Sequence, residues 1–197
     1  MRKFALVLAA FAVLSFVSVA HSQQIDLALG VGTILSSGSN SISQAYPPPA
    51  ERGGTFPSVS AGFIRKNHIG FNAEVTGRYR EALYNGYQGF RPVFYDVNAV
   101  FAPRLSKKSN AEFMAGVGGE TLVFYNRFHN CNYVACTTYT NSNHLMGHVG
   151  GGIRYYFWRS FFIRPEAHLY FIHNNFQFSS DYVARVGASI GYTRRLE

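Results

Sequence analysis

The chain has little charge, little cysteine and no cofactor motif. Asp, Glu, Lys and Arg together make up 14% of its 197 residues, whereas about a quarter is usual in a soluble domain. It has two cysteines and no Gly-rich phosphate loop, so neither a zinc site nor a nucleotide site is indicated, and no cofactor is expected. The length allows one ordinary domain.

Apolar and aromatic residues are abundant but dispersed. They reach 47% and 16% of the chain, with 19 glycines, while the mean hydropathy is only −0.03. This apolar content excludes a disordered chain, and the glycines are too many for a helical bundle. Apolar residues interleaved with polar ones are typical of an alternating β protein.

The first twenty residues have the pattern of a secretory signal peptide. Met1, Arg2 and Lys3 precede an apolar run from Phe4 to Val17, and Ser18-Val19-Ala20 provides a small-x-small cleavage site. A membrane anchor is the alternative, but the run is shorter than the roughly 20 residues that span a bilayer. We therefore expect a signal peptide over 1–20 and one domain over 21–197. Export argues against nucleic-acid binding despite the pI of 9.7.

Eight later segments alternate between apolar and polar residues with period two. Within them every charged residue falls on the less apolar face, which predicts strands with one apolar face each. The segments are Ile25–Thr33, Phe56–Ile64, Ile69–Arg80, Val93–Phe101, Phe113–Tyr125, Leu145–Phe157, Phe161–Phe171 and Tyr182–Tyr192. Pro165 lies on an apolar face and removes one ladder donor, which is the clearest local objection.

The connections alternate strictly between long and short. The long ones cover 35–55, 81–91, 126–143 and 173–181, and the short ones cover 65–68, 104–110 and 158–160. In an up-and-down antiparallel sheet this order places all long loops at one end and all short turns at the other. Both termini then lie at the short-turn end.

These segments and loops resemble the eight-stranded outer-membrane barrels of the OmpA/OmpX type. The resemblance implies an all-β, eight-stranded antiparallel up-and-down transmembrane β-barrel in a bacterial outer membrane, with its apolar face toward lipid. It also implies contact with outer-membrane lipids and with the barrel-assembly machinery, which commonly recognises a final aromatic residue. This chain departs from that pattern, because Thr193 to Glu197 follow Tyr192.

In such a barrel the charged residues of the strands would face the lumen. Because unpaired charges are costly there, we expect them to form a network that plugs it. The expected network contains Glu74, Arg78, Glu120, Arg154, Arg164, Glu166 and Arg185, with Asp26, Arg80, Asp96 and Glu112 also inside.

Basic residues gather in the short turns. A periplasmic collar is expected from Arg65, Lys66, Arg104, Lys107, Lys108 and Arg159, with Arg194 and Arg195 at the same end. We hypothesise that it contacts anionic phospholipid headgroups; ordinary solvated turns are the alternative. The long loops are rich in Tyr, Ser, Asn and Gly, which suits contact with an extracellular protein or glycan as well as plain polar loops.

Two cysteines lie close together in the third long loop. In an oxidising compartment Cys131 and Cys136 are expected to form a disulfide. Metal binding together with His129 is the alternative, but two thiols and one imidazole are a weak zinc signal.

Two other functions are considered beside a structural or surface-interaction role. Some barrels of this size are lipid A acyltransferases or deacylases, and the candidate groups here are His168 and His173 near Ser179 and Ser180, with Glu166 as an orienting carboxylate. A His-x-Ser arrangement is missing at His173, so we expect no catalytic residues. A soluble lipocalin-like carrier would bury the apolar face, but the other face is rich in glycine and poor in lysine, which is unusual for a solvated surface.

Overall fold

The computed structural model describes residues 23–35, 51–65, 67–84, 88–131, 136–175, 178 and 181–196, without the side chains of 126–137. The expected signal peptide falls outside these residues and stays a prediction. Within the described ranges, no helix is both long and apolar enough to cross a membrane.

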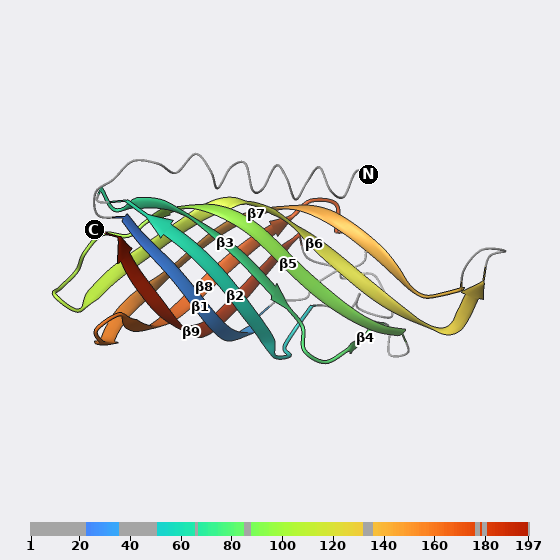
Figure 1. Cartoon of the computed structure of the whole chain (residues 1–197). Coiled ribbons are helices and arrows are strands. Elements are labelled where there is room, and N and C mark those ends of the chain that lie inside the picture. The colour runs from blue at the N-terminus through green and yellow to red at the C-terminus, as the bar shows by residue number, and fades with distance from the viewer. Residues whose placement is uncertain are drawn as a thin grey trace, which may run out of the picture.

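Within the described residues, nine strands form one closed antiparallel sheet (Figure 1). They are β1 (Gln23–Ile34), β2 (Phe56–Ile64), β3 (Ile69–Gly77), β4 (Ala82–Tyr84), β5 (Gln88–Phe101), β6 (Ser109–Cys131), β7 (Cys136–Trp158), β8 (Phe161–Ile172) and β9 (Tyr182–Leu196). The last strand pairs with the first from Gln23↔Leu196 to Ile34↔Arg185. Both β3 and β4 pair with β5, one after the other along its length. They therefore occupy one strand position, and the barrel has eight strand positions around its wall, which confirms the predicted eight-stranded barrel.

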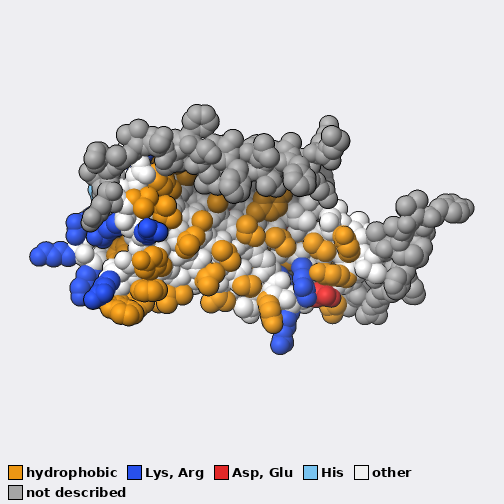
Figure 2. Space-filling view, viewed as in Figure 1, with side chains coloured by type: hydrophobic (Ala, Val, Ile, Leu, Met, Phe, Trp, Pro, Cys, Tyr) orange, Lys and Arg blue, Asp and Glu red, His pale blue; other side chains and the backbone are white. Residues whose placement is uncertain are grey.

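The two faces of the wall differ as the alternation predicts. Leu29 on β1 is 63% exposed and Leu145 on β7 is 70% exposed, whereas Glu74 on β3 is 2% exposed. Figure 2 shows hydrophobic side chains spread over the outer wall, with a group of Lys and Arg at one end and further Lys or Arg beside an acidic side chain toward the other. An outer surface this apolar is unsuited to water and suits a lipid bilayer.

Two glycines on β6 lie where the backbone of β5 is too close for any side chain. A Cβ on Gly116 would lie 2.1 Å from the carbonyl oxygen of Val97, and one on Gly118 would lie 2.0 Å from that of Tyr95. Both clashes are with the backbone of β5, so no other residue fits there without moving the strand.

The structure departs from the predicted segments in three places. The predicted strand through Arg80 ends at Gly77, and β4 follows after a break. The predicted loop 126–143 is largely strand, because β6 and β7 pair as far as Cys131↔Cys136. Pro165 lies within β8 and pairs with Ala188, but the β7–β8 ladder is interrupted between Gly152↔Glu166 and Tyr155↔Ile163, where proline has no N–H to donate.

Three apolar clusters lie along the lumen. One near the short turns contains Ile64, Val100, Ala102 and Met114. The central one, called the apolar layer below, contains Ile34, Phe56, Phe94, Met146, Tyr170, Ile172 and Val183. The third, at the loop end, contains Phe90, Leu122, Phe124 and Phe178, with Ala82 and Tyr84 against it.

Candidate functional site

The lumen between the short turns and the apolar layer holds a continuous chain of ion pairs. Arg154 bonds Asp26 at 2.5 Å and also bonds Glu112. Glu112 bonds Arg164 Nη1 at 2.7 Å, and Arg164 Nε bonds Glu166 at 2.7 Å. Arg185 completes the chain by bonding Glu74 and lying 3.6 Å from Glu166. Acid and base alternate, so each guanidinium has two carboxylate neighbours.

Neutral side chains make further contacts with this network. Thr193 donates to Asp26 at 2.5 Å, and Gln24 donates to both oxygens of the same carboxylate at 2.9 Å. Arg164 reaches Ser189 at 3.1 Å. The Arg154 guanidinium also lies over the Phe162 ring at 4.5 Å. The charges come from β1, β3, β6, β7, β8 and β9, so the network links most of the wall.

Two stacked histidines continue the network toward the apolar layer. His148 Nδ1 lies 2.6 Å from Asn98 Oδ1, and His148 Nε2 lies 2.9 Å from His168 Nδ1. Because Asn98 Oδ1 can only accept, His148 carries its proton on Nδ1 and accepts from His168. Nε2 of His168 then faces Glu166 Oε1 at 3.6 Å.

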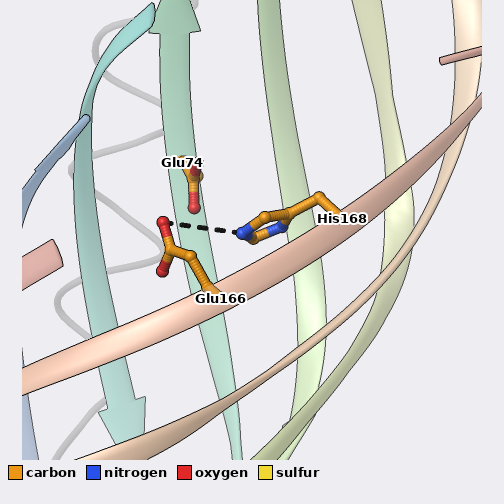
Figure 3. A group of neighbouring side chains, drawn as sticks. All are labelled: Glu74, Glu166 and His168. Carbon is orange, nitrogen blue, oxygen red and sulfur yellow. Dashed lines mark ion pairs between the residues drawn. The ribbon is translucent and has the colours of Figure 1, made fainter. Parts of the chain in front are cut away.

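Glu74, Glu166 and His168 form the one group of three His, Cys, Asp or Glu side chains, within the described part of the chain, that lie close enough to share a metal ion (Figure 3). Each offers one ligand atom, and these atoms lie within 4.8 Å of one another. The Arg185 guanidinium already bonds Glu74 and neighbours Glu166. A metal ion would have to displace it, so the group is better explained as part of the ion-pair chain.

The apolar layer lies between this network and the loop end. Phe94 and Tyr170 stack with ring centroids 5.0 Å apart, and Phe56 lies 6.2 Å from Phe94. All three side chains are fully buried. Water and ions passing along the lumen would have to cross these rings.

A second acidic group lies beyond the apolar layer. The carboxyl groups of Glu51 and Glu120 face each other, and Glu51 also faces Asn175. Burial raises the pKa of Glu51 to about 7, while Asn175, Glu120 and the positive charge of Arg78 act to lower it. Glu51 is a functional candidate that sequence analysis does not select, because its loop has no periodic pattern.

The short-turn end carries a basic cavity of about 530 Å³. Six cationic side chains line it, and among its lining residues there is no Asp or Glu. The cations are Arg65, Arg104, Lys107, Lys108, Arg159 and Arg195. The structure therefore brings together five of the six expected collar residues; Lys66 lies outside the described residues.

The expected lumen network is only partly assembled in the structure. Glu74, Arg154, Arg164, Glu166 and Arg185 are linked in one chain, together with Asp26 and Glu112. Arg78 and Glu120 are not part of it.

The absence of Arg78 and of Glu120 from the ion-pair chain corrects the predicted network, and each has a physical reason. Since β3 ends at Gly77, Arg78 turns to the loop end, where it bonds the Arg52 carbonyl at 3.5 Å and lies over the Phe56 ring. Arg80 is exposed for the same reason. Glu120 faces the lumen, but the apolar layer separates it from the arginines, because its partner across the β5–β6 ladder is Phe94.

The other predicted groups have mixed outcomes. The ladder pairs the backbone of Cys131 with that of Cys136, but their side chains lie outside the described residues, so the disulfide stays a prediction. His168 is buried in the lumen, whereas His173 lies at the turn after β8 at the loop end. Ser179 and Ser180 lie outside the described residues.

Comparisons with known proteins give the fold. No protein-family model and no curated protein matches the sequence. Among solved structures, neisserial surface protein A matches with a TM-score of 0.60 and 12% identity, covering 88% of this chain and 99% of that one. A major outer membrane protein of Thermus thermophilus matches with a TM-score of 0.62 and 10% identity, covering 88% and 100%.

The attachment invasion protein Ail of Yersinia pestis is also similar, with a TM-score of 0.55 and 13% identity over 89% of this chain and 100% of that one. At these identities the likeness concerns the fold, which is that of the small outer-membrane β-barrels. This fold and the apolar outer wall together place the chain in a bacterial outer membrane.

Proposed function

We propose that this small outer-membrane β-barrel has a plugged lumen and acts through the surface at its loop end, without catalysing a reaction. The observation that carries the proposal is the hairpin of β6 and β7. It continues beyond the strands on both sides of it and projects from the barrel (Figure 1). The hairpin is called the outer ribbon below.

The pairing registers define where the outer ribbon begins. Pairing of β5 with β6 ends at Gly89↔Tyr125, and pairing of β7 with β8 ends at Met146↔Ile172. Beyond these points β6 and β7 pair with each other as far as Cys131↔Cys136. Among the strands that the structure describes, none pairs with the outer edges of the ribbon, which supports binding of a partner protein by strand addition.

The contents of the lumen support a structural barrel without a pore. Eight strands enclose only enough space for side chains. Here three arginines and four carboxylates fill one part, and seven apolar side chains fill the next. We infer that ions do not pass at an appreciable rate.

The experiment replaces the ribbon by a tight turn. Residues 126–138 are deleted, and Asn-Gly joins Tyr125 to Tyr139, which are partners in the ladder. Cells that display the wild type should bind a panel of extracellular proteins more than cells with an empty vector, and the shortened variant should lose this binding. A heat-modifiable band shows that the variant still forms a barrel. Equal binding by both would refute the role of the ribbon.

A glycan is a second candidate for the external partner. Arg78, Arg80 and Arg91 line a groove of about 770 Å³ at the loop end. Ail has been solved in complex with the heparin analogue sucrose octasulfate, which makes heparin a suitable probe. Heparin binding that survives loss of the ribbon but not Arg80→Gln and Arg91→Gln would favour the glycan.

At the opposite end we propose that the collar contacts anionic phospholipid. Its basic side chains surround a cavity without acidic residues, and each is worth about 1 kcal/mol near an anionic surface. Changing Arg104, Lys107, Lys108 and Arg159 to Gln should slow insertion into vesicles containing phosphatidylglycerol but not into neutral ones. Unchanged rates in both would refute the contact. The last strand, which closes the barrel against β1, is the segment proposed to meet the assembly machinery.

A further inference from the structure

Two carboxyl groups at the loop end are buried facing each other, and within the described residues none of their oxygens makes a hydrogen bond of good geometry. Glu51 is 1% exposed, Glu120 is 0% exposed and Asn175 is 3% exposed. In the part of the chain that the structure describes, no group makes a hydrogen bond of good geometry with the four carboxyl oxygens or with the amide oxygen and nitrogen of Asn175. These three residues are called the acid cluster below.

The acid cluster is assembled from three separate segments, each tied to the wall by backbone bonds. Glu51 precedes a turn at Gly53 and Gly54, both with positive φ, and Gly53 N donates to the Ile34 carbonyl at 2.9 Å. Glu120 belongs to β6. Asn175 follows the turn after β8, where His173 N donates to the carbonyl of Leu145 on β7 at 2.8 Å. The side chains are therefore brought together by the fold and not by a local turn.

The surroundings of the cluster are apolar on two sides. Phe94 of the apolar layer is the ladder partner of Glu120, and Leu122 of the loop-end aromatic cluster is two residues further along β6. Two charged or titratable groups also face it. Arg78 acts on Glu51, and His144 is the ladder partner of Glu120 on β7.

Two ionised carboxylates in such a place are not balanced by one arginine. The Arg78 guanidinium bonds the Arg52 carbonyl and no oxygen of the acid cluster. An uncompensated buried carboxylate is strongly unfavourable. Either a proton or a cation must therefore occupy the space between the two carboxyl groups.

We propose that the acid cluster binds one divalent cation of the calcium class. Both carboxyl groups and the side-chain amide oxygen of Asn175 are hard oxygen ligands, which Ca²⁺ prefers. None of the three residues offers sulfur, which would favour a softer metal. Water molecules complete the coordination. The ion holds the segment before β2 and the segment after β8 against β6, so it orders the loop end of the barrel.

The experiment measures calcium binding by the full-length protein, refolded in detergent and freed of metal with EDTA. Isothermal titration with CaCl₂ at pH 8 should give one site with a dissociation constant of about 10⁻⁴–10⁻³ M. Glu120→Gln and Asn175→Ala should each weaken binding at least tenfold.

Glu81→Gln provides the matched control. Glu81 is a carboxylate at the same end, half exposed and 3.7 Å from Arg91, so its loss should leave calcium affinity unchanged. Heat modifiability verifies that each variant is folded. The proposal is overturned if the wild type gives no binding heat at 10 mM Ca²⁺, which would mean that the carboxyl groups share a proton. Equal affinity in the Glu120→Gln and Glu81→Gln variants would also overturn it.

Discussion

Arg185 provides the sharpest test of the lumen network. It bonds Glu74, which is 2% exposed, and lies 3.6 Å from Glu166. Arg185→Met keeps the volume but leaves Glu74 without this counter-charge. Breaking a buried pair in this way typically costs about 3–5 kcal/mol of unfolding free energy. Coulomb's law gives about 4 kcal/mol for unit charges 4 Å apart at an effective dielectric of 20, which agrees.

A double variant separates charge from packing. In Arg185→Met with Glu74→Gln no charge is left unpaired at Glu74, so at least about 2 kcal/mol of the loss should return. Arg91→Met is the matched control, since its ion pair with Glu81 spans 3.7 Å with side chains 39% and 46% exposed. Such a surface pair is worth about 0–1 kcal/mol.

The assay is equilibrium unfolding by urea in phospholipid vesicles. Fluorescence of Trp158, the single tryptophan, and gel mobility before and after heating report unfolding independently. The reasoning fails if Arg185→Met loses no more unfolding free energy than Arg91→Met does. It also fails if adding Glu74→Gln to Arg185→Met restores none of that free energy, because the lumen charges would then not stabilise the barrel.

Three further predictions concern the seal, the acid cluster and the membrane. Phe94→Ala removes a buried ring stacked on Tyr170 in the apolar layer. The variant should lose about 3–5 kcal/mol of unfolding free energy, and its single-channel conductance in planar bilayers should exceed that of the wild type. Unchanged conductance would contradict the idea that the apolar layer closes the lumen. Burial raises the pKa of Glu51 from 4.5 to about 7 in the folded state. The folded state therefore binds more protons between these values, so in EDTA the urea midpoint should fall as the pH rises from 5 to 7, whereas Glu51→Gln should show a flatter profile. A midpoint that rises across this window would contradict the assignment. Trp158, which is exposed beside Phe161, should be quenched more by lipids brominated near the headgroup than by those brominated near the chain end, and the reverse order would misplace the short-turn end.

The barrel could be predicted from the sequence because the apolar face must meet lipid along every strand. That requirement imposes period two on residues such as Leu27, Leu29 and Val31, and the alternating loop lengths then give the topology. Where lipid ends, the pattern ends too. The outer part of β6 and β7 was predicted as a loop, because both faces of a ribbon in water can be polar, as at Thr140 and Asn141.

The candidate sites were less predictable than the wall. Alternation predicts the side of the wall on which Arg154, Arg164 and Arg185 lie. It does not predict partners on strands distant in sequence, such as Asp26 for Arg154 and Glu74 for Arg185. Arg78 has the same parity as Glu74, yet a strand break removes it from the network. Glu51 had no signal at all, since its burial results from contacts with β6 and with the turn after β8.

The central claim is that an apolar wall faces lipid and a charged lumen lies inside. Membrane fractionation, with gel mobility in SDS before and after heating, tests it most directly. A band in the outer-membrane fraction that changes mobility on heating is the predicted result. A band in the periplasmic fraction with the same mobility before and after heating would contradict the account, because the apolar face would then have to be a core.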